Sequence, residues 1–152
     1  SAVQPAEQHG WLTRILGTWR YEAECEGPPG QPPMKGTGIE RVRLLGGYWA
    51  IGESEGECPG GGGQARMVVT MGFDPAARRF RGTFVGSMMP FMFVYDGALD
   101  EGATTLVLDT EGPAMKGEGT ARYRDSVTMQ GDALRIVGSE VQQPDGTWHR
   151  FM

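Results

Sequence analysis

The sequence predicts an all-β domain in which about ten antiparallel strands follow one another up and down around a barrel. From Trp19 to Glu26, large or apolar residues alternate with charged ones, as in a strand with one solvated face. Further strand-like runs follow at regular spacing, separated by turns that contain glycine, which is typical of successive hairpins. Glycine makes up 25 of the 152 residues, and a tightly curved sheet needs glycine where it bends.

The length and the composition limit the classes of protein. A chain of 152 residues is expected to form one domain over residues 1–152. The net charge is −5 and lysines and arginines do not cluster, which argues against nucleic acid and anionic membranes as partners. No apolar run reaches the length of a membrane span, and no secretory pattern opens the sequence. We therefore expect a cytoplasmic protein.

The first predicted element is one short helix over 5–16. Pro5 suits its first turn, and four apolar residues fall on one face: Trp11, Leu12, Ile15 and Leu16. Gly17 is a natural terminator. We expect this helix to plug one end of the barrel.

The strands are expected next, each bounded by glycine- or proline-containing turns. Pro90 is expected to break one run. The predicted strands cover 18–26, 34–45, 48–56, 65–73, 79–88, 91–99, 104–111, 118–129, 133–142 and 147–152.

The connections differ between the two ends of such a barrel. Turns after the second, fourth, sixth and eighth strands are short, and they share an end with the helix. The opposite end carries the connections at 27–33, 58–63, 87–91 and 112–117. The order predicts that the helix plugs its own end of the barrel, which we call the floor. The opposite end, with the longer connections, is predicted to be open, and we call it the mouth. Barrels of this size can hold one small ligand.

Several segments resemble known families. Leu16-Gly17-Thr18-Trp19 is similar to the start of calycin barrels, which include lipocalins, fatty-acid-binding proteins and haem-binding nitrobindins. The chain more closely resembles the bacterial domain-of-unknown-function 1579 family, over nearly its whole length from about residue 9. The segments that carry this resemblance are 45–49 (LGGYW), 71–75 (MGFDP), 80–89 (FRGTFVGSMM), 95–100 (YDGALD), 123–125 (YRD) and 145–148 (DGTW).

The resemblance implies a lipocalin-like barrel and no established activity. In lipocalins a late-strand arginine often packs over the tryptophan of the first strand. Arg150 is the candidate for that contact with Trp19.

Methionine and aromatic residues on alternating positions predict a pliable apolar pocket. The alternative is that the same side chains simply fill the barrel. The residues predicted to line the pocket are Tyr21, Met67, Val69, Met71, Phe84, Met88, Phe91, Phe93, Tyr95 and Tyr123, with Met89 and Met92 near them.

The segment from Arg122 to Asp125 can place only one of its two faces inside. Alternation with Val127 and Met129 favours Tyr123 and Asp125 inside, with Arg122 and Arg124 on the outer wall. The resemblance to fatty-acid-binding proteins implies the other arrangement, in which an inward arginine beside a tyrosine binds a carboxylate.

The histidines and cysteines offer little metal chemistry. His9 and His149 are the two histidines, so a histidine-based metal cluster is not expected. By resemblance to nitrobindins, His149 is an alternative axial haem ligand. The sequence does not decide whether its side chain faces the interior or the solvent. Cys25 and Cys58 lack metal-ligand spacing. We expect both to be reduced thiols, and a disulfide between them is the alternative.

The sequence therefore favours a non-enzymatic binding module that holds a small hydrophobic molecule and needs no cofactor. No nucleophile motif or phosphate loop accompanies the residues above. Two alternatives stand beside it. One is a haem-binding barrel, and the other is a packed barrel that serves as an interaction module and forms a homodimer.

Overall fold

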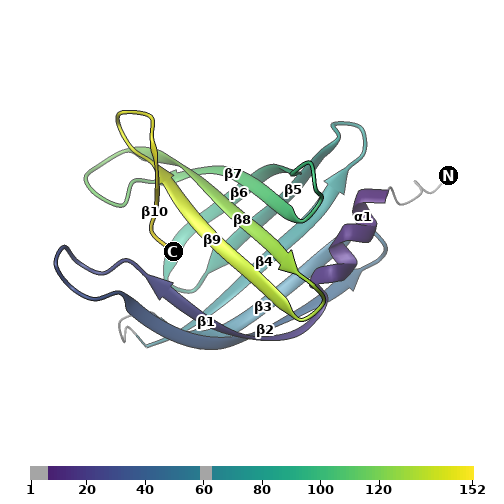
Figure 1. Cartoon of the computed structure of the whole chain (residues 1–152), viewed down its shortest axis with the longest axis horizontal. Helices are drawn as coiled ribbons and strands as arrows, with labels where there is room; N and C mark the ends of the chain where they lie inside the picture. Colours follow the sequence, from purple (N-terminus) through teal and green to yellow (C-terminus); the bar gives the residue numbers. More distant parts are fainter. Residues whose placement is uncertain (1–6, 59–62) are drawn as a thin grey trace.

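The computed structural model describes residues 7–58 and 63–152. Residues 5–6 of the expected helix and most of the glycine loop, 59–62, lie outside them. As predicted, ten antiparallel strands follow one another in sequence order, and they curl into a half-barrel (Figure 1). They are β1 (Gly17–Cys25), β2 (Met34–Leu45), β3 (Trp49–Glu57), β4 (Gln64–Asp74), β5 (Arg79–Gly86), β6 (Met89–Leu99), β7 (Thr105–Pro113), β8 (Thr120–Gln130), β9 (Leu134–Gln142) and β10 (Trp148–Arg150).

The predicted single helix is two short helices in the part of it that is described. The α-helix α1 covers Glu7–Trp11, and a 3-10 helix covers Leu12–Ile15. Gly10, a poor helix former, lies where the α-helix ends. Gly17 has a φ of 112°, which a glycine adopts without a Cβ penalty and which turns the chain into β1.

The helical segment closes one end of the half-barrel, beside the short turns (Figure 1). Trp11 donates its indole N–H to the carbonyl of Ala103, at 3.0 Å, and Leu12 is fully buried. The plugged floor is therefore confirmed. None of the helices described is long and apolar enough to cross a membrane.

The floor half of the interior is a packed core. Side chains from the helical segment and from alternating positions of the strands meet there, because a strand points every second residue inward. The main members are Leu12, Ile15, Met71, Phe73, Phe80, Leu106, Leu108 and Met129.

Pro90 does not break the run, contrary to the prediction. It lies at the second position of β6, next to an irregularity at which the register between β5 and β6 shifts from Phe84 to Gly86. Proline is tolerated at the start of a strand and at bulges because few ladder hydrogen bonds are lost there. The expected connection over 87–91 is consequently a tight turn at 87–88.

The sheet leaves a seam between its first and last strands. In the described residues no ladder joins β1 to β9 or β10. Near the floor, Arg135 of β9 forms an ion pair with Glu40 of β2 and lies over the ring of Trp19. Near the mouth, the Glu26 N–H donates to the carbonyl of Phe151, at 2.8 Å. Two sets of contacts thus hold the half-barrel together across the seam.

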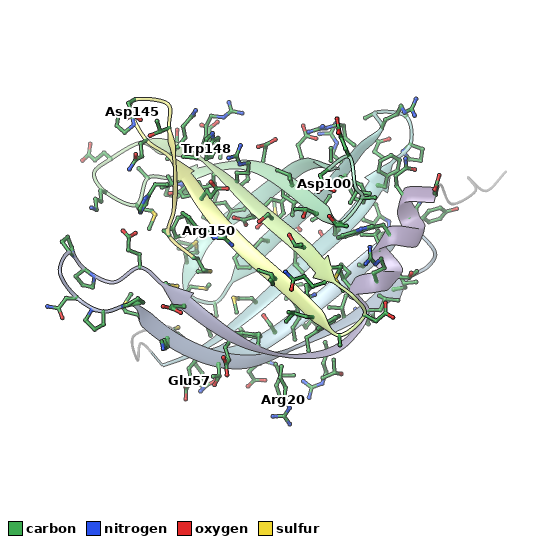
Figure 2. The ribbon with its side chains drawn as sticks, in the orientation of Figure 1. Arg20, Glu57, Asp100, Asp145, Trp148 and Arg150 are labelled. Carbon is green, nitrogen blue, oxygen red and sulfur yellow. The ribbon has the colours of Figure 1, made fainter. Side chains whose placement is uncertain are left out.

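The arginine over Trp19 is not the expected one. Arg150 lies on the outer face of the sheet, where its guanidinium covers Gly138 of β9 (Figure 2). The reason is the register of β9 and β10, which pairs Arg150 with Glu140 and gives the inward position to His149. Arg135 makes the contact with Trp19 instead, with its Cζ atom 4.8 Å from the ring centroid.

Candidate functional site

The residues predicted to line a pocket gather on the inner face of the half-barrel. Directly paired residues of antiparallel strands share a face, so the ladders place Val69, Phe84 and Phe93 side by side across β4, β5 and β6. Met88 lies in the turn after β5, but its thioether folds over Gly86 beside Met67. The others of the set occupy inward positions by alternation along β1, β4, β6 and β8.

Burial divides this set into two layers. Met71 and Tyr95 are buried in the packed floor, and Tyr123 is also buried but lies nearer the mouth, beside Phe93. The remaining inward residues are only partly covered, although most are large and apolar: Tyr21, Met67, Val69, Phe84, Phe91 and Phe93. The mouth half of the inner face is therefore an incompletely covered apolar surface.

Aromatic rings line that surface in a continuous series. Phe84 and Phe91 each contact Phe93, with centroids 6.2 Å and 4.9 Å apart. Phe93 meets Tyr123 edge-on at 6.1 Å, and Tyr123 meets Phe151 at the same separation. Such tilted and edge-to-face contacts fix ring positions without filling the space in front of them.

An open groove of about 950 Å³ runs along the seam, between β9 and residues from both faces of β1 to β3. Its floor is formed where the Tyr21 ring lies over Gly38 and Gly56, which have no side chains to hold the ring away. Its β9 side combines Arg135 with the apolar Leu134, Ile136 and Val137, and Leu134 and Val137 are both 51% exposed. Tyr21 is the predicted pocket residue that lines this groove.

A polar cluster lies on the inner face, below the aromatic series. Tyr95 donates its hydroxyl to a carboxylate oxygen of Asp125, at 2.5 Å. Ser139 is paired directly with Asp125 in the ladder of β8 and β9, and its hydroxyl also interacts with the carboxylate. Burial raises the pKa of Asp125, and the hydrogen bonds from the two hydroxyls lower it. The effect of burial is the larger, so the pKa is raised overall. Burial and the neighbouring Asp125 also raise the pKa of Tyr95.

Thr110 adds an unmet hydrogen-bonding group to this cluster. It is paired with Tyr123 in the ladder of β7 and β8, one inward position from Asp125. Its side-chain oxygen is buried and has no hydrogen-bond partner among the described residues. Buried polar groups are nearly always hydrogen-bonded, so an exception requires an explanation.

The orientation favoured for residues 122–125 is confirmed. Tyr123 and Asp125 face inward, and the Tyr123 hydroxyl donates to the carbonyl of Pro113. Arg124 lies outside, 3.5 Å from Glu140 and with its Cζ atom 4.2 Å from the ring centroid of Trp148. The carboxylate-binding arrangement of an inward Arg122 or Arg124 beside Tyr123 is therefore absent.

His149 occupies an inward register position, opposite Val141 at the mouth. Its Nε2 atom is 2.5 Å from a carboxylate oxygen of Glu26, and both side chains are substantially exposed. This pair adds to the mouth-side contacts across the seam. In the described parts of the chain, no three His, Cys, Asp or Glu side chains group closely enough to hold a metal ion.

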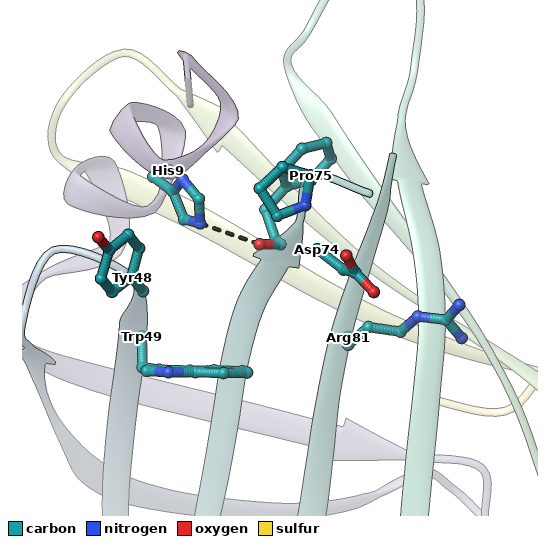
Figure 3. Close-up of a pocket in the computed structure, with 7 residues that line it drawn as sticks. His9, Tyr48, Trp49, Asp74, Pro75 and Arg81 are labelled. Carbon is teal, nitrogen blue, oxygen red and sulfur yellow. Dashed lines mark hydrogen bonds between the residues drawn. The ribbon is translucent and has the colours of Figure 1, made fainter. Parts of the chain in front are cut away.

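A second, smaller cleft of about 400 Å³ lies at the floor, where α1 meets the turn before β3 and the end of β4 (Figure 3). Its lining combines the segments 45–49 and 71–75. The Trp49 indole lies over Gly72, and His9 donates from Nε2 to the carbonyl of Phe73 at 2.9 Å. The ring of His9 also makes edge-to-face contacts with Tyr48 and Phe73, which attach α1 to the turn before β3 and to the end of β4. These two segments thus serve to dock the helix.

Sequence reasoning missed the inward ion pair of Glu40 and Arg135 and the unpartnered Thr110. Each lies two residues from an inward apolar position, Val42, Val137 and Leu108 respectively. Strand alternation alone therefore indicated an inward orientation for all three side chains. For Glu40 and Arg135 the orientation was missed because charged residues are usually expected on the solvated face.

Comparison with known proteins adds a family and no activity. Residues 4–152 match the family described as "Protein of unknown function (DUF1579)". No curated protein matches the chain.

Proposed function

The chain belongs to the DUF1579 family, and from its geometry we propose that it binds a small, mostly apolar molecule inside the half-barrel. The observation that carries the proposal is the contrast between the two halves of the inner face. The floor half is packed and Phe84 packs against it, whereas the mouth half leaves Phe91 and Phe93 partly exposed. A protein that needed these rings only for stability would gain by covering them.

The size of the seam groove agrees with this proposal. Ligand sites commonly measure about 300–1,000 Å³ and are lined by apolar and aromatic side chains with a few polar groups. The groove of about 950 Å³ falls at the upper end of that range, and its lining mixes apolar with charged and polar side chains. It offers lateral access to the inner face beside Tyr21.

Titration with Nile red, a neutral dye whose fluorescence rises in apolar surroundings, tests the proposal directly. We expect saturable binding, and a Kd at least about tenfold higher for Phe93→Ser, which removes an inner ring. Val94→Ser is the matched control, since Val94 is the next residue of β6, points outward and is 59% exposed. Absence of saturable binding, or equal effects of the two substitutions, would contradict the proposal.

Native mass spectrometry of gently purified protein gives an independent readout. A retained organic mass on the wild-type chain that is lost in Phe93→Ser supports an inner-face ligand. A mass retained equally by both proteins places the ligand elsewhere and contradicts the proposal.

Haem ligation by His149 is a lesser proposal, which the inward register of that residue favours. The nitrogen that would hold iron already has Glu26 as its partner, so ligation requires that contact to be given up. A Soret band on haem addition that disappears in His149→Ala would support it. An unchanged spectrum in that variant would contradict it.

Cys25 and Cys58 are both free thiols. We include a cytoplasmic location in the proposal because reduced cysteines are the rule in that compartment. Cell fractionation checks it: the protein is expected in the cytoplasmic fraction, and recovery from an oxidising compartment would contradict it.

A further inference from the structure

Among the described residues, the inner face carries one carboxylate that no cation of the structure neutralises. Glu40 is paired with Arg135, and the side chains of both are largely buried, at 16% and 11% exposed. In the part of the chain that the structure describes, the hydrogen-bond partners of Asp125 are two hydroxyls, those of Tyr95 and Ser139. The direct ladder partner of Asp125 on the other side is Leu108, which is apolar. Asp125 is thus a hydrogen-bond acceptor on the inner face that is not paired with a cation among the described residues.

This acceptor lies within reach of the proposed apolar site. Phe93 and Tyr95 are successive inward residues of β6, as are Tyr123 and Asp125 on β8. The contact of Phe93 with Tyr123 therefore forms one layer, and the bond of Tyr95 to Asp125 forms the next layer towards the floor. Asp125 retains partial exposure although its neighbour Tyr95 is buried.

The carboxylate has hydrogen-bonding capacity left. Two oxygens offer about four acceptor positions, and the hydroxyls of Tyr95 and Ser139 occupy two of them. Thr110, one inward position away, has a hydroxyl without a partner among the described residues. A ligand group that donates to Asp125 can take one of the remaining acceptor positions.

From these contacts we propose that the half-barrel selects amphiphiles whose polar end donates hydrogen bonds, amines and alcohols, over those that end in a carboxylate. Asp125 is the residue that makes the selection. This inference rests on the proposed function, because the tail of such a ligand occupies the aromatic layer. A ligand carboxylate would place a second negative charge beside Asp125, or require one of the two to be protonated.

Arg135 does not reverse this preference. Its guanidinium is already bonded to Glu40 and lies over Trp19. A ligand carboxylate would have to displace Glu40 and leave that side chain unpaired in a largely buried position, which is costly. Arg122 and Arg124 are parts of the outer wall, as shown above by the contacts of Arg124.

Displacement of Nile red by decylamine, decanol and decanoate tests the selection, because the three share one tail. With wild-type protein at neutral pH we expect decylamine and decanol to bind at least about tenfold more tightly than decanoate. Asp125→Asn should reduce the preference for decylamine over decanoate by about tenfold. Asp109→Asn is the matched control, since its position in β7 is outward, opposite Arg124.

The outcomes separate the inference from the proposed function. Failure of Nile red and of all three amphiphiles to bind would reject both. Three outcomes in which Nile red still binds would reject the inference alone. In the first, decanoate binds as tightly as decylamine or more tightly, and in the second, no amphiphile displaces the dye. In the third, Asp125→Asn and Asp109→Asn change the preference for decylamine over decanoate equally. Near-ultraviolet circular dichroism of Asp125→Asn establishes that the variant is folded.

Discussion

The guanidinium of Arg135 lies over the indole of Trp19, with its Cζ atom 4.8 Å from the ring centroid, and forms an ion pair with Glu40 on the next strand. These residues come from β9, β1 and β2, and no ladder of the described residues joins β9 to β1. Trp19 also donates its indole N–H to the carbonyl of Ile15, at 2.9 Å. The helical segment, the first strand and the far edge of the sheet are therefore connected through one tryptophan.

Removal of Arg135 is expected to weaken the fold strongly. Arg135→Met leaves Glu40 as an unpaired carboxylate in a largely buried position, which costs roughly 3 kcal/mol of unfolding free energy. Urea denaturation followed by tryptophan fluorescence measures this loss. Combining Arg135→Met with Glu40→Met should recover most of it, because no buried charge then remains.

Arg43→Met is the control for that experiment. Arg43 pairs with Glu53 at 3.8 Å on the outer wall, and their side chains are 62% and 63% exposed. Its loss should change the unfolding free energy by less than about 0.5 kcal/mol. Equal effects of Arg135→Met and Arg43→Met would show that the seam contact is not structural.

Asp125 and Asp100 are expected to give opposite pH dependences of stability. The pKa of Asp125 is raised in the folded chain, mainly by burial, so between the unfolded value of about 3.9 and that raised value the native state binds the proton more tightly. The contribution of Asp125 to stability therefore falls as pH rises through this window. The stability of Asp125→Asn relative to wild type should increase from acid to neutral pH.

Asp100 provides the contrast. The backbone N–H groups of Thr104 and Thr105 donate to its carboxylate and lower its pKa. Its contribution is present above the unfolded pKa and is lost as pH falls through the native one. The deficit of Asp100→Asn should therefore shrink in acid. Urea denaturation between pH 3 and pH 8 checks both variants, and trends of the same sign would contradict this account.

Thr110→Val is expected to leave the free energy of unfolding unchanged or to raise it, by up to about 1 kcal/mol. The substitution replaces a buried, unpartnered hydroxyl by a methyl group of similar shape. Thr83→Val is the control, since the hydroxyls of Thr83 and Thr70 lie 2.7 Å apart and the loss of that bond should cost about 1 kcal/mol. Both substitutions keep a β-branched residue in the strand. A larger loss in Thr110→Val than in Thr83→Val, by thermal or urea denaturation, would contradict the assignment.

The sequence was sufficient for the order of the strands and for most of the inward positions. Strict alternation in β1 and β4, with glycine turns between the runs, predicts both, because each is a local property of the backbone. The orientation of Asp125 followed from its alternation with Val127 and Met129 in the same way.

Features that depend on how the sheet curls were beyond sequence reasoning. Arg135 and Glu40 lie 95 positions apart, and their contact depends on the seam between β9 and β1. Arg150 was expected over Trp19, but a register in which His149 takes the inward position directs it outward. Pro90 was expected to end a run, because the irregularity that accommodates it between β5 and β6 has no local sign.

Gly112 tests how closely the aromatic layer is packed. It is an inward residue of β7, paired with Ala121, and a Cβ there would overlap the ring of Phe93. The obstruction is a side chain rather than backbone, so Gly112→Ala should displace that ring and cost about 1–3 kcal/mol of unfolding free energy. It should also alter the Nile red titration, because Phe93 belongs to the proposed site.

Phe93→Leu should restore much of the stability that Gly112→Ala removes. The smaller side chain can move away from the new methyl group, so the two substitutions should be coupled by more than about 0.5 kcal/mol in a double-mutant cycle. Gly102→Ala is the control, since the nearest atom to a Cβ there is the Thr104 hydroxyl at 3.8 Å. Additive effects of Gly112→Ala and Phe93→Leu would mean that the ring and the glycine do not share this space.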